Sequence, residues 1–148
     1  MKLITAFFIQ GHPMPAGSKK YVGHSKAGKA IIVDMSGRKG ANWRKVCQLT
    51  AKKYYQGEPI DGPLIVNMSF FLLRPKKNYT SKGLLKNSAP KYHLTKPDKT
   101  KLCRATEDAL TGILWRDDSM IFDGRISKGY VDHLFPNEGC WIEVYQPD

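Results

Sequence analysis

The chain has 148 residues, a formal net charge of +11 and a pI near 9.6. This length fits a single domain, here residues 1–148, that can bury a core without a disulfide or a structural metal. No segment approaches the roughly 18 apolar residues that a membrane span needs. The apolar run at residues 3–9 ends at Gln10 and Gly11, too soon for a signal segment. Composition therefore predicts a soluble protein and excludes a membrane-spanning one.

The three cysteines, Cys47, Cys103 and Cys140, are far apart in the sequence and form no C-x-x-C motif. Neither a disulfide framework nor a zinc site is indicated, and a reducing cytoplasm is the expected compartment.

Charge is distributed unevenly along the chain. Residues 1–97 hold 18 Lys/Arg against 3 Asp/Glu, whereas residues 98–148 hold 6 against 10. A basic body predicts a polyanionic partner. Carboxylates repel such a partner unless a cation lies between them, so the acidic segment favours a divalent metal. The alternative is an acidic segment that is merely solvated.

A first strand is expected over residues 3–9, and a short one over residues 31–33. Residues 14–30 between them are rich in glycine and lysine, which predicts a mobile loop that lies along a phosphate backbone. An ordinary exposed hairpin is the alternative. The candidate DNA contacts in this loop are Lys19, Lys20, Lys26 and Lys29.

Apolar residues at spacings of three and four predict an amphipathic helix over residues 41–55, with Trp43 and Tyr54 in the core. The run over residues 63–73 is apolar on both faces, which predicts a central strand.

Residues 74–97 form a long polar stretch with seven Lys/Arg and no acidic residue. Loops of this length inside a compact domain are usually functional or disordered. We expect a DNA-contacting loop, with a solvated insertion as the alternative. Tyr79, Tyr92 and His93 would either stack on bases or attach the loop to the core. The candidate contacts are Arg74, Lys76, Lys77, Lys82, Lys86, Lys91 and Lys96.

The acidic segment begins at Asp98, which stands where the N-cap of a helix over residues 98–112 belongs. A turn then carries Asp117 and Asp118, and residues 120–128 are expected to form a strand. If that strand runs beside the one that feeds Asp98, the carboxylates converge at one end of the sheet. Such oxygen-rich sites suit Mg²⁺ or Mn²⁺ in phosphodiester hydrolysis. The alternative reading makes Asp98 a helix cap, Asp117 and Asp118 a polar turn, and Asp108 an exposed helical residue.

The order KPD, K-L-x-R-A, D-A-L-T-G and W-x-D-D-S-x-I, with a later Lys, resembles the RusA-like family of Holliday junction resolvases, which is common in phages and prophages. The specific resemblance covers residues 95–128. The G-x-P-x-P-x-G-S-K loop at residues 11–19 agrees more loosely.

This resemblance implies a homodimer whose aspartates bind Mg²⁺ and which cuts a four-way DNA junction symmetrically. It implies metal ligands at Asp98 and Asp118, with Asp117 beside them, and a catalytic basic residue at Arg104. Lys101 lies on the same helical face within reach of the site. The family's second aspartate falls on Thr100, which has no carboxylate. A hydroxyl or water, or another carboxylate such as Asp108 or Asp123, would have to compensate; otherwise the chain binds junctions and cuts poorly.

The expected fold is α/β (α+β), a mixed sheet of about four to six strands with two main helices. The expected function is that of a Mg²⁺-dependent endodeoxyribonuclease for branched DNA, acting as a symmetric dimer. Two alternatives remain: a DNA-binding protein without catalysis, and a metal nuclease for flaps or single strands.

Overall fold

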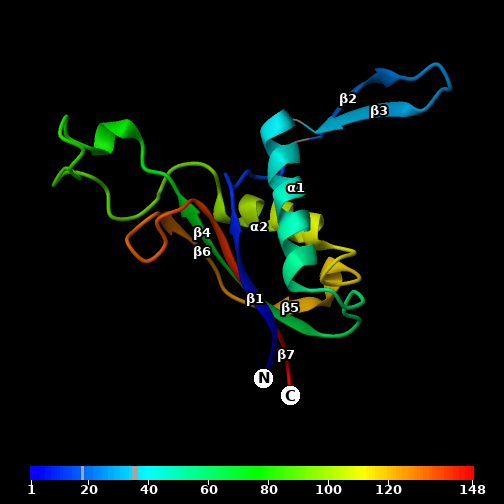
Figure 1. Ribbon diagram of the computed structural model, residues 1–148. Coiled ribbons are helices and arrows are strands. Elements are labelled where there is room, and N and C mark those ends of the chain that lie inside the picture. Colours follow the sequence, from blue (N-terminus) through cyan, green and yellow to red (C-terminus); the bar gives the residue numbers. More distant parts are fainter. Residues whose placement is uncertain (18, 35–36) are drawn as a thin grey trace.

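The computed structural model describes residues 1–17, 19–34 and 37–148, without the side chains of residues 19–21 and 32–34. Its elements, in chain order, are β1 (Lys2–Gln10), β2 (Lys19–His24), β3 (Ala30–Asp34), α1 (Gly37–Tyr54), β4 (Leu64–Leu72), the 3₁₀ turn η1 (Lys76–Asn78), α2 (Lys99–Leu110), the 3₁₀ turn η2 (Asp118–Met120), β5 (Ile121–Asp123), β6 (Ile126–Tyr130) and β7 (Gly139–Gln146). The α+β class is confirmed, and so are a mixed sheet and two main helices (Figure 1).

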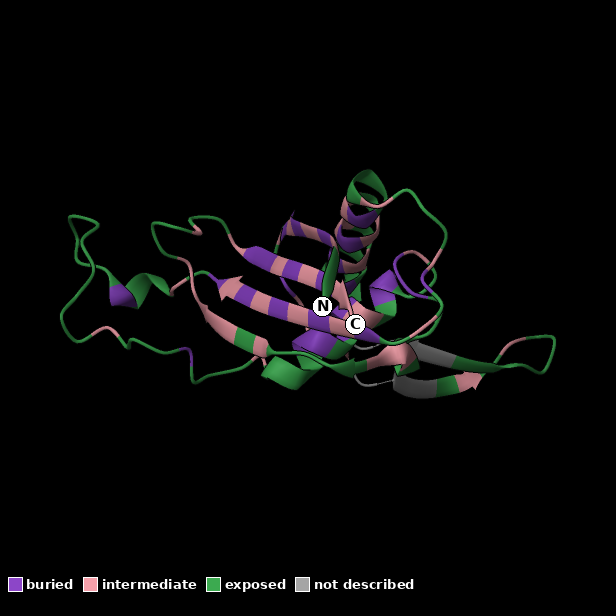
Figure 2. Cartoon of the chain, turned by 90° about the horizontal axis from the view of Figure 1, so that it is seen from below, coloured by how far each residue is buried: buried purple, intermediate pink, exposed green. Residues whose placement is uncertain are grey.

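β4 lies inside the main sheet, as its apolar run predicted. It pairs antiparallel with β7 on one side and parallel with both β5 and β6 on the other, while β1 forms the edge beyond β7. Every second residue of β4, from Leu64 to Leu72, is buried. The alternation is visible as stripes along the strands (Figure 2). One face of the sheet therefore packs on the helices and the other is only partly covered.

The two helices pack against each other on the buried face of the sheet. Trp43 of α1 is buried, as predicted, and its indole N–H donates to the hydroxyl of Thr106 in α2 at 3.2 Å. Tyr54, also predicted to be core, is instead 52% exposed, and one face of its ring stacks on Phe7 with the ring centroids 5.4 Å apart. α1 begins at Gly37, four residues before the predicted start.

All three cysteines lie in the core as free thiols. Burial raises the pKa of the Cys47, Cys103 and Cys140 thiols well above the ordinary value. None of the three takes part in a disulfide.

Two arms project from the body on opposite sides (Figure 1). One is the β2–β3 hairpin, so the predicted mobile loop over residues 14–30 is in part an antiparallel hairpin, the alternative considered from sequence. The other arm is formed by residues 74–97, in which Tyr79 pairs with Leu85 around a turn over residues 80–83. This second arm is therefore a long loop that contains the 3₁₀ turn η1 and a short hairpin at its end.

The strand predicted over residues 120–128 is divided into β5 and β6 at Gly124. A Cβ at this position would lie 1.8 Å from the carbonyl oxygen of Val66, and φ is +149°. Only glycine allows this close approach of backbone to backbone. Neither helix in the described part of the chain has the length and apolar character that crossing a bilayer requires.

Candidate active site

Asp98 precedes the first residue of α2, where a cap belongs, but its carboxylate makes no capping hydrogen bond. It is instead 3.7 Å from the ammonium of Lys101, one turn along the helix. Both groups line a pocket of about 320 Å³ with Lys96, His12 and Leu72. The cap reading from sequence therefore holds for the backbone only, and the carboxylate is available to a ligand.

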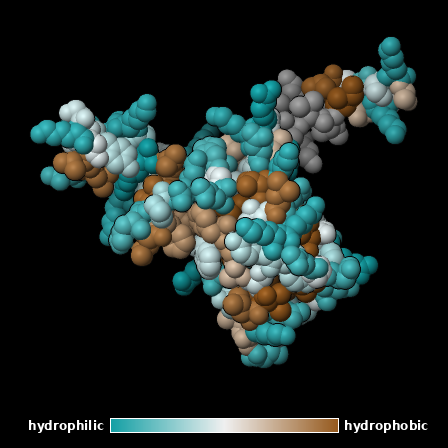
Figure 3. All heavy atoms as spheres, in the orientation of Figure 1, coloured by the Kyte–Doolittle hydropathy of each residue, from teal (hydrophilic) through white to brown (hydrophobic). Residues whose placement is uncertain are grey.

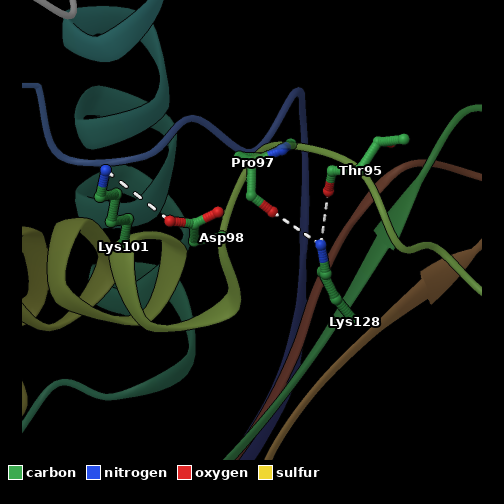
Figure 4. A network of polar contacts seen from close by, with 5 residues as sticks. All are labelled: Thr95, Pro97, Asp98, Lys101 and Lys128. Atoms are coloured by element: carbon green, nitrogen blue, oxygen red, sulfur yellow. Dashed lines mark hydrogen bonds and ion pairs between the residues drawn. The ribbon is translucent and has the colours of Figure 1, made fainter.

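Lys128 of β6 binds the chain segment that leads to Asp98. Its ammonium donates to the backbone carbonyls of Thr95 at 2.6 Å and Pro97 at 2.9 Å (Figure 4). On the other side, the backbone N–H of Ala16 donates to the carbonyl of Lys101 at 3.1 Å. The start of α2 is thus held both by Lys128 of a strand and by the backbone of Ala16.

Thr100 and Arg104 are exposed on α2. They lie four residues apart, so their side chains share one helical face. This is the face on which the resemblance places the second metal ligand and the basic catalytic residue.

Asp117 and Asp118 lie beyond the other end of α2. The Asp117 carboxylate accepts a hydrogen bond from the backbone N–H of Ser119 at 2.8 Å, which holds the pKa of Asp117 below its usual range. The pKa of Asp118 is raised, first by loss of hydration and then by the neighbouring carboxylates of Asp117 and Asp108. Asp117 is thus used in the turn, whereas Asp118 is exposed and crowded by like charge.

Glu107 adds a further carboxylate that the sequence analysis did not single out. It is half-buried on α2 and accepts a hydrogen bond from the Cys103 thiol at 2.9 Å. Burial, with the charges of Asp118 and Asp108, raises its pKa. A pocket of about 280 Å³ is lined by both Glu107 and Asp123. Glu107 lies three residues before the buried Leu110 on an amphipathic helix, and this spacing could have predicted that Glu107 faces the core side of α2.

The convergence of Asp98 with Asp117 and Asp118 was conditional on strand placement, and that condition is not met within one chain. Ile121, just after Asp118, pairs with Leu64 at the start of β4, whereas the Asp98 pocket is lined by Leu72 at its end. The eight steps between these residues correspond to about 26 Å. Among the described residues, no three His, Cys, Asp or Glu side chains gather into a metal-holding group.

The predicted DNA contacts lie mostly on the two arms. Lys26 and Lys29 are exposed near the tip of the β2–β3 hairpin, and the side chains of Lys19 and Lys20 lie outside the described residues. The exposed lysines of the second arm are Lys76, Lys77, Lys82, Lys86, Lys91 and Lys96.

Arg74 has a structural role at the base of the second arm. Its guanidinium donates to the Asn78 side chain at 3.2 Å and to the Pro90 carbonyl at 2.6 Å, and stacks 4.1 Å over the ring of Tyr130. His93 is buried against the same ring at 5.0 Å. His93 therefore attaches the arm to the body, whereas Tyr92 is 65% exposed.

Comparison with known proteins gives two matches. The chain is 26% identical over 134 residues to the uncharacterized protein YqaN of Bacillus subtilis (strain 168), covering 85% of this chain and 87% of that protein. The family model of the endodeoxyribonuclease RusA matches residues 10–137, which include both arms, Asp98 and Asp118. The chain therefore belongs to the RusA endodeoxyribonuclease family.

Proposed function

We propose that the protein is a divalent-metal-dependent endonuclease that cuts Holliday junctions or related branched DNA as a symmetric dimer. Membership of an endodeoxyribonuclease family supports the reaction class. The observation that carries the proposal is the crowding of the Asp117, Asp108 and Glu107 carboxylates near Asp118, whose pKa is raised first by loss of hydration and then by the charges of Asp117 and Asp108. Like charges held together in this way are relieved by a bound cation.

The chemistry of these donors fits Mg²⁺, or Mn²⁺ in its place. Mg²⁺ commonly takes one or two carboxylates and keeps several waters, so Asp118, assisted by Asp117, would supply part of the ligand set from one chain. When bound, the ion would polarise the scissile phosphate and acidify the attacking water. Arg104 and Lys101 would bind phosphate oxygens on the exposed face of α2.

A dimer would bring Asp98 and Asp118, which lie apart in one chain, into a shared site. Asp98 and Asp118 lie at opposite ends of α2, which is about 18 Å long. Two copies related by a two-fold axis near the middle of α2 would bring Asp98 of one subunit toward Asp118 of the other. The outer face of α2 is open to such a contact, since Thr100, Arg104 and Asp108 are exposed. The same symmetry would present two sites to the two strands of a junction.

The test uses labelled four-way junction, flap, duplex and single strand, each with Mg²⁺, Mn²⁺ or EDTA. We expect cleavage of the junction with metal, none with EDTA, and loss of about a hundredfold or more in rate for Asp118→Asn. Asp148→Asn, an exposed terminal aspartate, is the control. Junction binding without product in either metal would favour a binding protein without catalysis. Preferred cutting of flaps or single strands would identify a different nuclease.

A further inference from the structure

The second arm ends in an ordered hairpin over residues 78–86. Lys86 N–H donates to the Asn78 carbonyl at 2.9 Å and Thr80 N–H to the Leu84 carbonyl at 2.7 Å. The turn is closed by Gly83, whose φ of +79° is left-handed, and its N–H donates to the Thr80 carbonyl. The tip thus has a defined shape before any ligand arrives.

This tip displays apolar side chains beside cations. Leu84 is 65% exposed and Leu85 is 51% exposed. The neighbouring Lys82 and Lys86 are exposed, and no residue from 74 to 97 is acidic. The apolar patch stands out on the projecting arm among hydrophilic atoms (Figure 3). Single exposed leucines need no explanation, but two in succession at the end of an ordered basic arm do.

The base of the arm is braced against the sheet. Arg74 and His93 both contact the ring of Tyr130 in β6, and Lys128 of the same strand binds the chain at Thr95 and Pro97. Both ends of the arm are therefore attached to one strand. A hairpin that is fixed at its base can hold its tip in position against DNA, whereas an unattached loop would be displaced.

Resting on the proposed function, we propose that Leu84 and Leu85 form a wedge that enters branched DNA at its branch point and unstacks the bases there. Apolar side chains that DNA-binding proteins insert between base steps work in this way, and the cost of unstacking is lowest where stacking is already interrupted. Lys82 and Lys86 would bind the flanking phosphates. The lysines supply affinity for any DNA, and the leucines supply preference for a branch.

The experiment places 2-aminopurine at the branch point of a four-way junction, or within one of its arms, and measures fluorescence with the full-length protein in EDTA. Wild type is expected to raise the branch-point signal and leave the arm signal unchanged. Leu84→Ser/Leu85→Ser should abolish that rise and reduce the preference for junction over duplex about tenfold. Leu49→Ser, which changes a leucine 58% exposed on α1, is the matched control. Lys82→Ala/Lys86→Ala should weaken binding to junction and duplex equally and lower the salt dependence.

An unchanged branch-point signal in Leu84→Ser/Leu85→Ser would overturn the wedge, as would an equal loss of junction and duplex binding. A change in oligomeric mass with DNA binding intact would also overturn it and assign the tip to a protein contact. Because EDTA prevents cleavage, the two proposals fail separately. Unstacking without cleavage in Mg²⁺ or Mn²⁺ refutes the nuclease alone, and junction cleavage without unstacking refutes the wedge alone.

Discussion

The two ends of α2 differ in charge: lysines occupy the first turn after Asp98, and carboxylates lie near the last turn. The first turn has Lys99 and Lys101 and no acidic residue, whereas Glu107 and Asp108 lie near the C-terminus, where Asp118 approaches. The helix dipole favours anions at the N-terminus and cations at the C-terminus, by about 0.3–1 kcal/mol for each exposed charge. Apart from Asp98, which precedes its first residue, the charges of α2 oppose its dipole, as expected if they serve the proposed binding of metal and phosphate rather than the stability of the helix.

The largest expected effect comes from mixing subunits. If Asp98 and Asp118 of different chains form one site, Asp98→Asn and Asp118→Asn are each inactive alone, yet a heterodimer of the two keeps one intact site. Random mixing should restore about one quarter of the wild-type sites, measured as single nicks without paired cuts. No recovery in co-expressed, doubly tagged heterodimers would mean that each site is built within one chain.

Lys128→Met tests how the basic end of α2 is held. Loss of the two hydrogen bonds to the Thr95 and Pro97 carbonyls should let Asp98 shift and lower kcat about tenfold. Junction affinity in EDTA should change little, because Lys128 is half-buried. Lys99→Met, which removes an exposed lysine from the same region, is the control. If both variants lower affinity equally, Lys128 acts as a phosphate contact.

Thr100→Asp adds a carboxylate to the basic end of α2, where the family pattern has one. The metal concentration for half-maximal cleavage should fall about fivefold, because a further negative charge offsets more of the cost of dehydrating the ion. Thr100→Asn controls for shape. An unchanged concentration would place Thr100 outside the metal site.

The smallest expected effect is on the pH dependence of stability, and it comes from replacing His93, in the segment that leads to Asp98. Burial, and then the charge of Lys128, lower its pKa below 6.5. The folded state thus favours neutral His93, so its contribution to stability is complete above pH 6.5 and is lost as pH falls through the folded-state pKa. The melting temperature should fall less between pH 7.5 and pH 5 in His93→Gln than in wild type. An identical fall would assign the acid sensitivity to other groups.

Local patterns predicted the elements that carry α2 and its surroundings. The apolar run of β4 predicted its ends to within one residue, and Gly112, with φ of +87°, follows the end of the helix that starts after Asp98. These features depend on neighbours in sequence, where periodicity and backbone freedom are decisive. The resemblance through KPD, DALTG and W-x-DD agrees with the family match.

Features that depend on distant contacts could not be read in the same way. β5 pairs with the start of β4 rather than its end, which separates Asp118 from Asp98, and no local pattern encodes that choice. Glu107 becomes part of the acidic group only because α2 places it near Asp118. The hairpin at residues 78–86 had a recoverable signal, since T-S-K-G fits a turn with glycine in the left-handed position.

Because all three cysteines are buried, the protein exposes no native thiol to reagents in solution. Since all three native thiols lie in the core with raised pKa values, alkylating reagents and mild oxidants have little thiolate to attack. A cysteine introduced at Leu84 would then be the single reactive thiol, and a maleimide dye attached there could report the arm's distance from a labelled DNA end without any native residue being replaced.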